Sequence, residues 1–572
     1  MKNSVLKSNQ TFLHDFWHLA KPYWASEEKW YALGLLTLNI LFMIAGVKAS
    51  LGLNEFYKEF VNALQKFNYH ELSIALLHFA EFTLLAVIAT GYAFYCNNLL
   101  SLRWRRWLTQ HYLDRWLSNH HYHDINQQNN SIDNPDQRIS EDLEHLPTKS
   151  LAIFFVVFDS CLRIATFGFL LWKLSIDLIF SIKSISFVIP GYLFFAGLLF
   201  GLTGPLITKW LAKKLAGLDY ELEQCNADFR YSLIRCRESS EQIALSKGEK
   251  FENHNFQTRF KTIYNNFINI IKTRKRIEFF NSGYNNIGMI FGYLISLPIY
   301  MQRKITLGTL MQISGALGYF TDAFFKLISS YNLFTEWRAV IYRLNKFNES
   351  MNFSYDNAEL KIIETKHHKI HIHNLTIKNI DGSILSNNIN MKFLPGYSYL
   401  ITGPASAGKS TLFRCIAGLW PYASGLIEIP KNANLLFIPQ KNYLPTGTLK
   451  DILIYPNMQF FDTIMLENLL EVCQLKNLCS QLSTTKNWAQ ILSPSEQQLL
   501  NFARILLQKP QYVFLDQATS ALNEHTESFM YETLKEFLPQ ICIISTGQRN
   551  NLLQIHDQVL ELTLQIKESH FE

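Results

Sequence analysis

The 572-residue chain has little charge for its size and no sign of a disulfide framework. Charged residues make up 17% of it, whereas 48% is apolar and 14% aromatic, which argues against an ordinary soluble protein. None of the 8 cysteines lies in a C-x-x-C spacing, so reduced structural thiols are expected. The residues before Tyr31 lack the apolar core and cleavage site of a signal peptide. The first apolar stretch is therefore expected to stay in the mature protein.

In place of charge the chain has apolar segments of about 20 residues, long enough to cross the hydrocarbon core of a bilayer. They predict a membrane protein whose all-α membrane domain covers residues 1–345, with six spans, at 31–53, 74–100, 151–172, 184–208, 283–301 and 307–328. Basic residues concentrate in the connections after the second and fourth segments. The positive-inside rule therefore predicts that these connections, both termini and the C-terminal part lie in the cytosol, although Arg303 and Lys304 run against it. These basic residues account for the net charge of +6, which gives no reason to invoke nucleic acid.

A few ionisable residues fall inside the predicted spans, where an unpaired charge is costly. They are Glu81, Asp159 with Arg163 one helical turn on, and Asp322 with Lys326 at the same spacing. Intrahelical pairing near a membrane surface explains such pairs simply. A water-filled cavity is the alternative, and it is favoured here for Glu81 and Asp159.

A phosphate-binding loop is predicted at GPASAGKST, residues 403–411. The apolar run 397–402 before it predicts a buried strand, and 412–419 after it has helical spacing. Glycines let the backbone curl so that several N–H groups face one anion at the positive end of the helix dipole. Lys409 would reach the β- and γ-phosphates, and Ser410 would ligate Mg²⁺. The sequence therefore predicts an ATP-type site formed by Gly403, Pro404, Ala405, Ser406, Ala407, Gly408, Lys409, Ser410 and Thr411.

The residues for hydrolysis are less complete than those for binding. A short apolar strand, 512–515, ends in Asp516, a carboxylate placed to hold the Mg²⁺ shell, but the next residue is the amide Gln517 where chemistry asks for a carboxylate. Further upstream, Ser493 as N-cap, Pro494 at the first helical position and Glu496 as the capping-box partner predict a helix start. Such a start is also an anion site, which could meet the γ-phosphate of a nucleotide bound by a second copy of the domain.

Six ordered motifs resemble those of the ATP-binding cassette (ABC) transporters, and the match covers essentially the whole chain. They are GPASAGKST for the Walker A loop, Gln440 for the Q-loop, LSPSEQQLLNFAR for the signature, YVFLDQ for Walker B, SALN for the D-loop and STGQR for the switch. LFRCIAGLWPYASG, NYLPTGTL and IDNPDQRISEDL resemble one branch more narrowly. That branch groups bacterial SbmA/BacA-related transporters carrying a fused ATPase domain with peroxisomal fatty-acyl transporters.

The resemblance implies a half-transporter, an ABC exporter-type membrane domain followed by an α/β P-loop ATPase domain at 367–572, after a polar linker at 346–366. It implies Mg²⁺ near Ser410, Gln440 and Asp516, catalytic positions at Gln440, Gln517 and Gln548, and a homodimer through both domains. Two ATP molecules would lie between the Walker A loop of one subunit and Ser493, Ser495 and Glu496 of the other. The implied cargo is peptides or other large hydrophilic compounds, such as peptide antibiotics or cobalamin-like molecules, moved inward across a bacterial inner membrane. Fatty-acyl compounds are the alternative cargo.

Three residues depart from the family pattern: Gln517 replaces a Glu, Gln548 a His, and Ser495 a Gly. Gln517 cannot accept a proton, Gln548 cannot carry charge, and the Cβ of Ser495 limits backbone approach to phosphate. An engineered Gln517 that traps a dimer would not explain the other two, so natural divergence toward slow or absent hydrolysis is favoured. A nucleotide-gated or proton-driven carrier without turnover, and a heterodimer with an intact partner, stay open.

Histidines cluster at 367, 368, 371 and 373. Alternation along a strand could place two or three imidazoles on one face. Without cysteine or acidic partners in the pattern, metal binding is not favoured.

Overall fold

The computed structural model describes residues 2–127, 134–175, 179–182, 185–188, 190–352, 359–404, 406–457 and 459–562. It divides the chain into two compact units, Met1–Asn352 and Phe353–Glu572. Ala405 of the predicted phosphate-binding loop lies outside the described residues, as do Ile132 and Asp133 of the IDNPDQRISEDL stretch.

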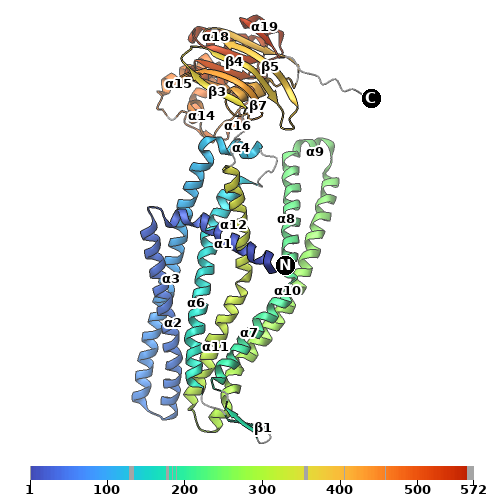
Figure 1. The fold of residues 1–572 in the computed structure, drawn as a ribbon. Coiled ribbons are helices and arrows are strands. Elements are labelled where there is room, and N and C mark those ends of the chain that lie inside the picture. Colours follow the sequence, from blue (N-terminus) through green and yellow to red (C-terminus); the bar gives the residue numbers. More distant parts are fainter. Residues whose placement is uncertain are drawn as a thin grey trace. The chain divides into compact units, whose positions relative to one another are not determined.

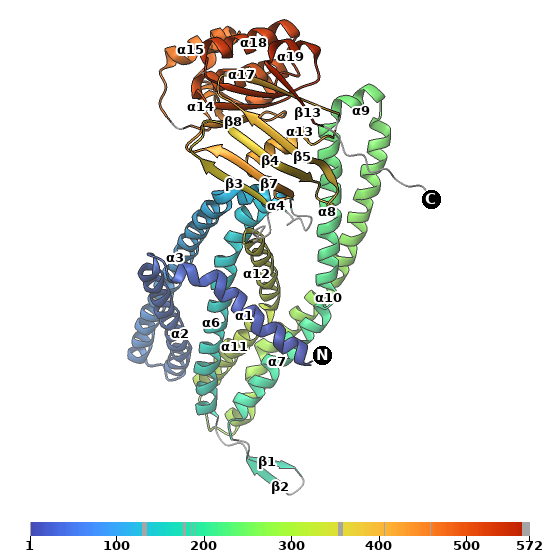
Figure 2. The ribbon, with the colours of Figure 1, turned by 45° about the horizontal axis from the view of Figure 1, so that its top comes forward.

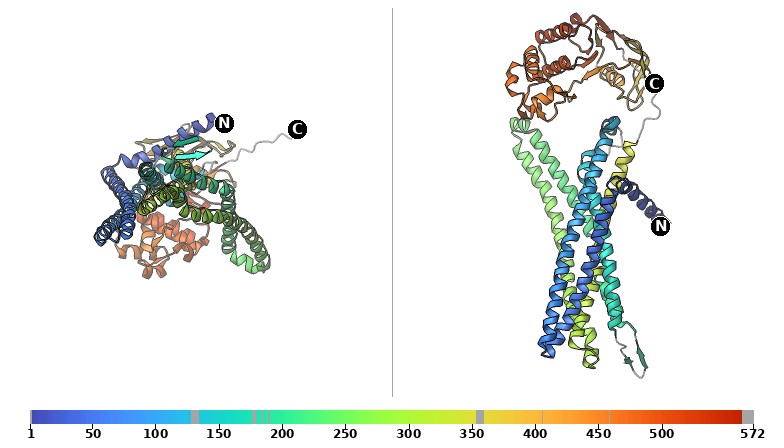
Figure 3. Two further views of the ribbon diagram at one scale, coloured as in Figure 1. Left: turned by 90° about the horizontal axis from the view of Figure 1, so that it is seen from below. Right: turned by 90° about the vertical axis from the view of Figure 1, so that its left-hand side faces the viewer.

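The N-terminal unit is built from long helices and one β-hairpin (Figure 1). In chain order its elements are α1 (Lys2–Trp24), α2 (Lys29–Gln65), α3 (Tyr69–Leu117), η1 (Ser118–His120), α4 (His121–Gln127), α5 (Pro135–Gln137), η2 (Arg138–Asp142), α6 (Leu143–Leu174), β1 (Ile179–Ile182), β2 (Ile185–Val188), α7 (Tyr192–Ala212), α8 (Leu215–Glu238), α9 (Ser240–Ser246), α10 (Glu249–Met301), α11 (Leu307–Ser329) and α12 (Tyr331–Met351). The green helices α8 and α10 run side by side and are joined through α9 (Figures 1 and 3).

Local sequence sets the ends and the packing of these helices. The Asn68 side chain caps α3 by accepting from the backbone N–H groups of His70 and Glu71, at 3.1 and 3.3 Å. Helices α10 and α11 approach so closely at Gly292 that a Cβ there would lie 2.6 Å from the Cα of Ser314. Small residues at this crossing let the two backbones meet.

Five of the six predicted spans lie within helices, namely 31–53 in α2, 74–100 in α3, 151–172 in α6, 283–301 in α10 and 307–328 in α11. The fourth, 184–208, differs, because β2 occupies its start and α7 begins only at Tyr192. Pro190 disfavours helix before it and Gly191 has φ +70°, so the helix cannot extend further toward the N-terminus.

The helices that contain the predicted spans also differ in how apolar they are. Among the described residues, four helical stretches are long and apolar enough to cross a membrane: Lys29–Gln65, Tyr69–Ile125, Pro135–Leu174 and Tyr192–Ala212. Helices α10 and α11 carry more polar residues and fall below that apolarity. The count of six spans therefore stays a prediction.

The expected polar linker at 346–366 contains regular structure at both ends. Helix α12 continues to Met351 because Val340, Leu344, Phe347 and Met351 keep a helical apolar spacing and are buried. Strand β3 occupies Leu360–Thr365, and residues 353–358 lie outside the described part of the chain.

The C-terminal unit contains two larger sheets and the helices that cover them. Its elements are β3 (Leu360–Thr365), β4 (Ile370–Lys378), β5 (Ile384–Phe393), β6 (Ser398–Thr402), α13 (Lys409–Ile416), β7 (Ala423–Pro430), β8 (Leu435–Ile438), β9 (Gly447–Thr448), α14 (Leu449–Ile454), α15 (Thr463–Val472), η3 (Lys476–Gln481), β10 (Thr485–Lys486), α16 (Trp488–Ile491), α17 (Pro494–Gln508), β11 (Tyr512–Asp516), α18 (Glu524–Phe537), β12 (Cys542–Thr546), α19 (Asn550–Ile555) and β13 (Gln558–Glu561).

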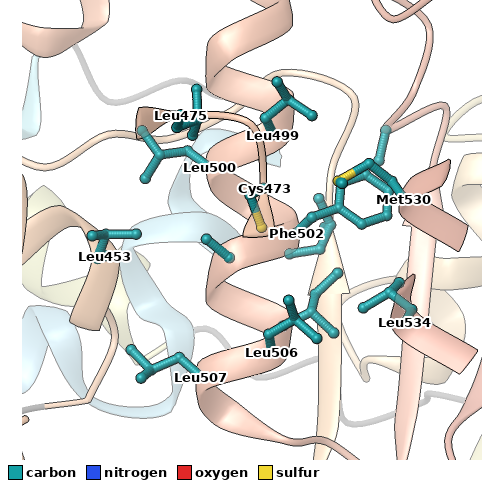
Figure 4. Packing of buried hydrophobic residues seen from close by; sticks show 14 of the residues in the cluster. Leu453, Cys473, Leu475, Leu499, Leu500, Phe502, Leu506, Leu507, Met530 and Leu534 are labelled. Carbon is teal, nitrogen blue, oxygen red and sulfur yellow. The ribbon is translucent and has the colours of Figure 1, made fainter. Parts of the chain in front are cut away.

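Strand order explains where a site can form. The parallel sheet runs β13-β6-β12-β11-β8, so the carboxyl ends of β6, β8, β11 and β12 meet at one edge. The second sheet, β3-β7-β4-β5, is antiparallel except for the β3–β7 pair (Figure 2). One apolar core joins both sheets to α13, and another packs α14, α15, α17 and α18 on the parallel sheet (Figure 4).

Candidate nucleotide-binding site

The predicted strand–loop–helix at 397–419 is present as β6, the loop 403–408 and α13. Gly403 has φ +141°, and a Cβ there would lie 2.5 Å from the carbonyl oxygen of Leu562. Gly408 has φ +84° and forms the N-cap of α13. Both positions need glycine, because a side chain would be strained at either and would clash at Gly403.

Lys409 is held at the centre of this loop. Its Nζ donates to the carbonyl oxygens of Gly403 and Pro404, at 2.7 and 2.8 Å, and only 7% of the residue is exposed. Burial lowers the pKa of Lys409, whereas the charge of Asp516 raises it. The ammonium group is therefore positioned where phosphate oxygens could replace the two carbonyls as acceptors.

Asp516, at the end of β11, is oriented by a residue that sequence reasoning missed. The hydroxyl of Thr546 donates to Asp516 Oδ1 at 2.8 Å and accepts from the backbone N–H of Gln517 at 3.1 Å. Asp516 and Thr546 are ladder partners on the parallel strands β11 and β12. One buried threonine therefore fixes both the carboxylate and the residue after it.

Gln440 and Gln517 lie together at the same sheet edge. Gln440 follows β8 and Gln517 follows β11, its parallel neighbour, and Gln440 Nε2 donates to Gln517 Oε1 at 2.9 Å. Gln517 has φ +50°, which turns the chain sharply after the strand. The Gln517 oxygen is thus engaged, and its amide nitrogen can only donate.

The switch residues lie next to the loop. Gln548 lines a pocket together with Thr402, Gly403 and Pro404. Arg549 beside it donates to the carbonyl oxygens of Ser520 and Leu522, both at 2.7 Å. The switch is therefore tied to the 520–523 loop.

The predicted helix start at Ser493 is present with both halves of its capping box. Ser493 Oγ accepts from the Glu496 N–H at 3.3 Å, and Glu496 Oε2 accepts from the Ser493 N–H at 2.9 Å. Hydrogen bonds from Ser493 lower the pKa of Glu496, so the carboxylate form is favoured. None of the described hydrogen bonds of Ser493, Ser495 or Glu496 reaches the 403–411 loop of the same chain.

Ser495 has a role that the sequence did not indicate. Its hydroxyl donates to the carbonyl oxygen of Ala521 at 3.1 Å, and the Gln498 side chain bonds Ser520 Oγ and the Ala521 N–H at 3.1 and 2.9 Å. Helix α17 and Arg549 therefore both hold the 520–523 loop.

Of the five ionisable residues singled out in the predicted spans, four are paired within their helices. Arg163 Nε donates to both carboxylate oxygens of Asp159, at 2.9 and 3.0 Å, and Lys326 lies 3.1 Å from Asp322. Asp159 and Arg163 also line a pocket between α2, α3 and α6. Glu81 is exposed on α3.

The loop around Lys409 and the oriented carboxylate of Asp516 are typical of an ATP-binding domain. The long apolar helices are typical of a membrane domain, and here both are part of one chain. Residues 19–301 match the ABC transporter transmembrane region 2, and residues 386–520 match the ABC transporter ATPase family. The chain belongs to the ABC transporter family, with a membrane region and an ATPase domain in one polypeptide. The predicted family is confirmed.

Relatives and a solved structure agree with this. An uncharacterized ABC transporter ATP-binding protein of Haemophilus influenzae is 33% identical over 96% of this chain and 92% of its own length. The Escherichia coli inner membrane ABC transporter ATP-binding protein YddA is 28% identical over 95% and 96%, and the human lysosomal cobalamin transporter ABCD4 is 25% identical over 96% and 95%. A bacterial Atm1-family ABC exporter with ATP bound has a similar fold, with a TM-score of 0.72, 15% identity and coverage of 93% and 94%. The predicted fold class, a helical membrane domain followed by an α/β P-loop domain, is confirmed.

Proposed function

We propose that the protein is a homodimeric half-transporter that binds ATP with Mg²⁺, hydrolyses it slowly, and moves large hydrophilic compounds inward across a bacterial inner membrane. The observation that carries this proposal is the Gln440–Gln517 hydrogen bond beside a complete Lys409 loop. The loop has every group needed to hold phosphates. The residue placed to activate water is an amide already engaged through its oxygen.

Residues 403–411 would hold the phosphates, with Ser410, Gln440 and Asp516 around Mg²⁺. The magnesium ion would offset the charge of the phosphates there. The Thr546–Asp516 hydrogen bond supports this, because it holds the carboxylate at the strand end beside the loop.

The dimer is supported by the helix start at Ser493. Its capping box is formed, its first backbone N–H groups lie at the positive end of a 15-residue helix, and its hydrogen bonds do not extend to the loop of its own chain. We propose that Ser493, Ser495 and Glu496 meet the ATP held by a second copy.

Cargo, topology and location rest on likeness and composition. The name of YddA places that relative in the inner membrane, and ABCD4 is named as a cobalamin transporter, which supports cobalamin-like cargo over fatty-acyl compounds. Peptide-like cargo rests on the resemblance of the sequence motifs. Six spans, cytosolic termini and a cytosolic ATPase domain belong to this proposal. Coupling to the ATPase domain would run through NPDQRISEDL and Ala227–Glu249.

Slow hydrolysis is expected because the residue at position 517 is an amide, which cannot act as a base. A glutamate at position 517 would accept the same hydrogen bond from Gln440 with one oxygen and keep the other free for a proton of water. Gln517 has a single acceptor oxygen, which can orient a water molecule but cannot take its proton. The same observation favours one second candidate, a carrier that ATP binding closes without any turnover.

The test is phosphate release by the full-length chain in lipid nanodiscs, with parallel ATP-dependent uptake of cobalamin and of a cationic peptide into proteoliposomes. We expect slow release from the parent, faster release from Gln517→Glu, and none from Lys409→Ala, the control that lacks the phosphate grip. Normal ATP binding without phosphate release in both the parent and Gln517→Glu would contradict ATP-driven transport and support the gated carrier.

A further inference from the structure

Two histidines and one glutamate form a cluster on the antiparallel sheet, apart from the nucleotide site. His371 and His373 alternate along β4, and Glu428 on β7 is the ladder partner of His371. The intervening Ile370 and Ile372 are buried in the core on the other face. Strand pairing therefore supplies an acidic partner 55 or more residues away in sequence, which the histidine pattern alone does not reveal (Figure 2).

The spacing of the three side chains does not fit hydrogen bonding. Glu428 Oε2 lies 3.8 Å from His371 Nδ1 and 3.6 Å from His373 Nε2. These distances exceed those of a hydrogen bond. His373 Nε2 is moreover buried without a hydrogen-bond partner. Ordinary ion pairing therefore leaves a buried polar nitrogen unsatisfied.

The same spacing suits three ligands of one metal ion. The candidate ligand atoms of the cluster all lie within 4.8 Å of one another. Bonds of about 2.0–2.1 Å in tetrahedral geometry place zinc ligands roughly 3.3 Å apart. A contraction of a few tenths of an ångström would bring the Glu428 oxygen to that distance from each histidine nitrogen.

Access is compatible with a cation. The neutral imidazole is the form that binds metal. The side chains of His371, His373 and Glu428 are 16%, 35% and 22% exposed, which leaves a path for an ion and for a fourth ligand from solvent.

We propose that His371, His373 and Glu428 form a binding site for a divalent transition metal, with Zn²⁺ as the ion that best suits two imidazoles and one carboxylate. The ion would join β4 to β7 and leave one position open to water. Because it would bind the folded chain and not the unfolded one, it would stabilise the fold by mass action. The site shares no residue with the ATP site.

The test uses the full-length, tag-free chain, stripped with chelator and free of nucleotide. Zn²⁺ alone is titrated by calorimetry, and thermal unfolding is recorded with and without it. We expect one Zn²⁺ per chain at this site and a rise in the unfolding temperature. Cobalt substitution should give the visible spectrum of a four-coordinate site with nitrogen and oxygen ligands.

Variants assign the ion to this cluster. His373→Ala and Glu428→Gln should each weaken Zn²⁺ binding by about tenfold or more. The matched control is His367→Ala/His368→Ala, which removes the two neighbouring histidines outside the cluster and should bind as the parent does. Glu428→Gln keeps the side-chain shape and protects the test against misfolding of His373→Ala. Unchanged binding in Glu428→Gln, or an equal loss in the control, would overturn the proposal.

Discussion

The two sides of the nucleotide site differ in their chemistry. On the loop side, the Lys409 ammonium is buried and donates to two loop carbonyls. On the opposite side, two neutral amides, Gln440 and Gln517, bond each other where a proton acceptor would be needed. We therefore expect that cleavage can be altered at position 517 without loss of ATP binding.

The largest expected effect is a faster hydrolysis of ATP when an ionisable residue is restored at position 517 or 548. A correctly placed general base contributes about 10²–10⁴ in rate. We expect Gln517→Glu to gain most of that factor. Gln548→His should add less, because we expect a group there to act on the γ-phosphate and not on the attacking water. Single-turnover phosphate release from both single variants and the double variant measures this. A larger gain from Gln548→His alone would show that position 548, and not position 517, limits the rate of hydrolysis.

Removing the Lys409 charge should weaken the binding of ATP. Truncating a buried, hydrogen-bonded charge costs about 2–5 kcal/mol. Lys409→Ala should therefore weaken ATP binding by that amount, whereas Lys431→Ala, an exposed lysine in the same domain, should not. Equilibrium binding of a fluorescent ATP analogue checks both. Equal ATP affinities for Lys409→Ala and the parent would show that Lys409 does not hold ATP.

Acid should destabilise the fold through His556, a buried residue that hydrogen-bonds Ser545 next to Thr546. Burial lowers the pKa of His556 from 6.5 to about 4. The unfolded chain therefore binds a proton that the folded chain does not, so stability present above pH 6.5 falls as the pH drops toward 4, by about 3 kcal/mol in all.

Thermal unfolding of the full chain at pH 7 and pH 5 tests this. His556→Gln should show a smaller loss between the two pH values than the parent. The same loss in both chains would show that other groups control the acid response.

The smallest expected effect concerns Ser495. Ser495→Gly removes the hydrogen bond to the Ala521 carbonyl and should lower stability by about 1 kcal/mol. Amide exchange should accelerate at residues 520–523. Phosphate release should change far less than in Gln517→Glu. A rate gain as large as that of Gln517→Glu would place the main obstacle in the signature helix.

Local patterns predicted local structure well. The loop with its two glycines, the Ser493–Glu496 capping box and the strand ending at Asp516 all depend on neighbouring residues, and each is present. The helix continuing to Met351 and the late start of α7 were missed, because polar composition and apolar length say little about where a helix ends.

Long-range partners could not be predicted from one sequence. Thr546 meets Asp516, Gln440 meets Gln517, and Glu428 meets His371 only because particular strands pair in a particular register. That register depends on packing across the whole sheet. A sequence motif identifies its own residues but not the distant residues that orient them.

The loop 520–523 accepts hydrogen bonds from Arg549 and is also held by Ser495 and Gln498 of α17. A displacement of the switch would therefore reach the start of α17 through a continuous chain of hydrogen bonds. A serine that hinders close approach to phosphate would, by the same bond, transmit motion between the two ends of the site.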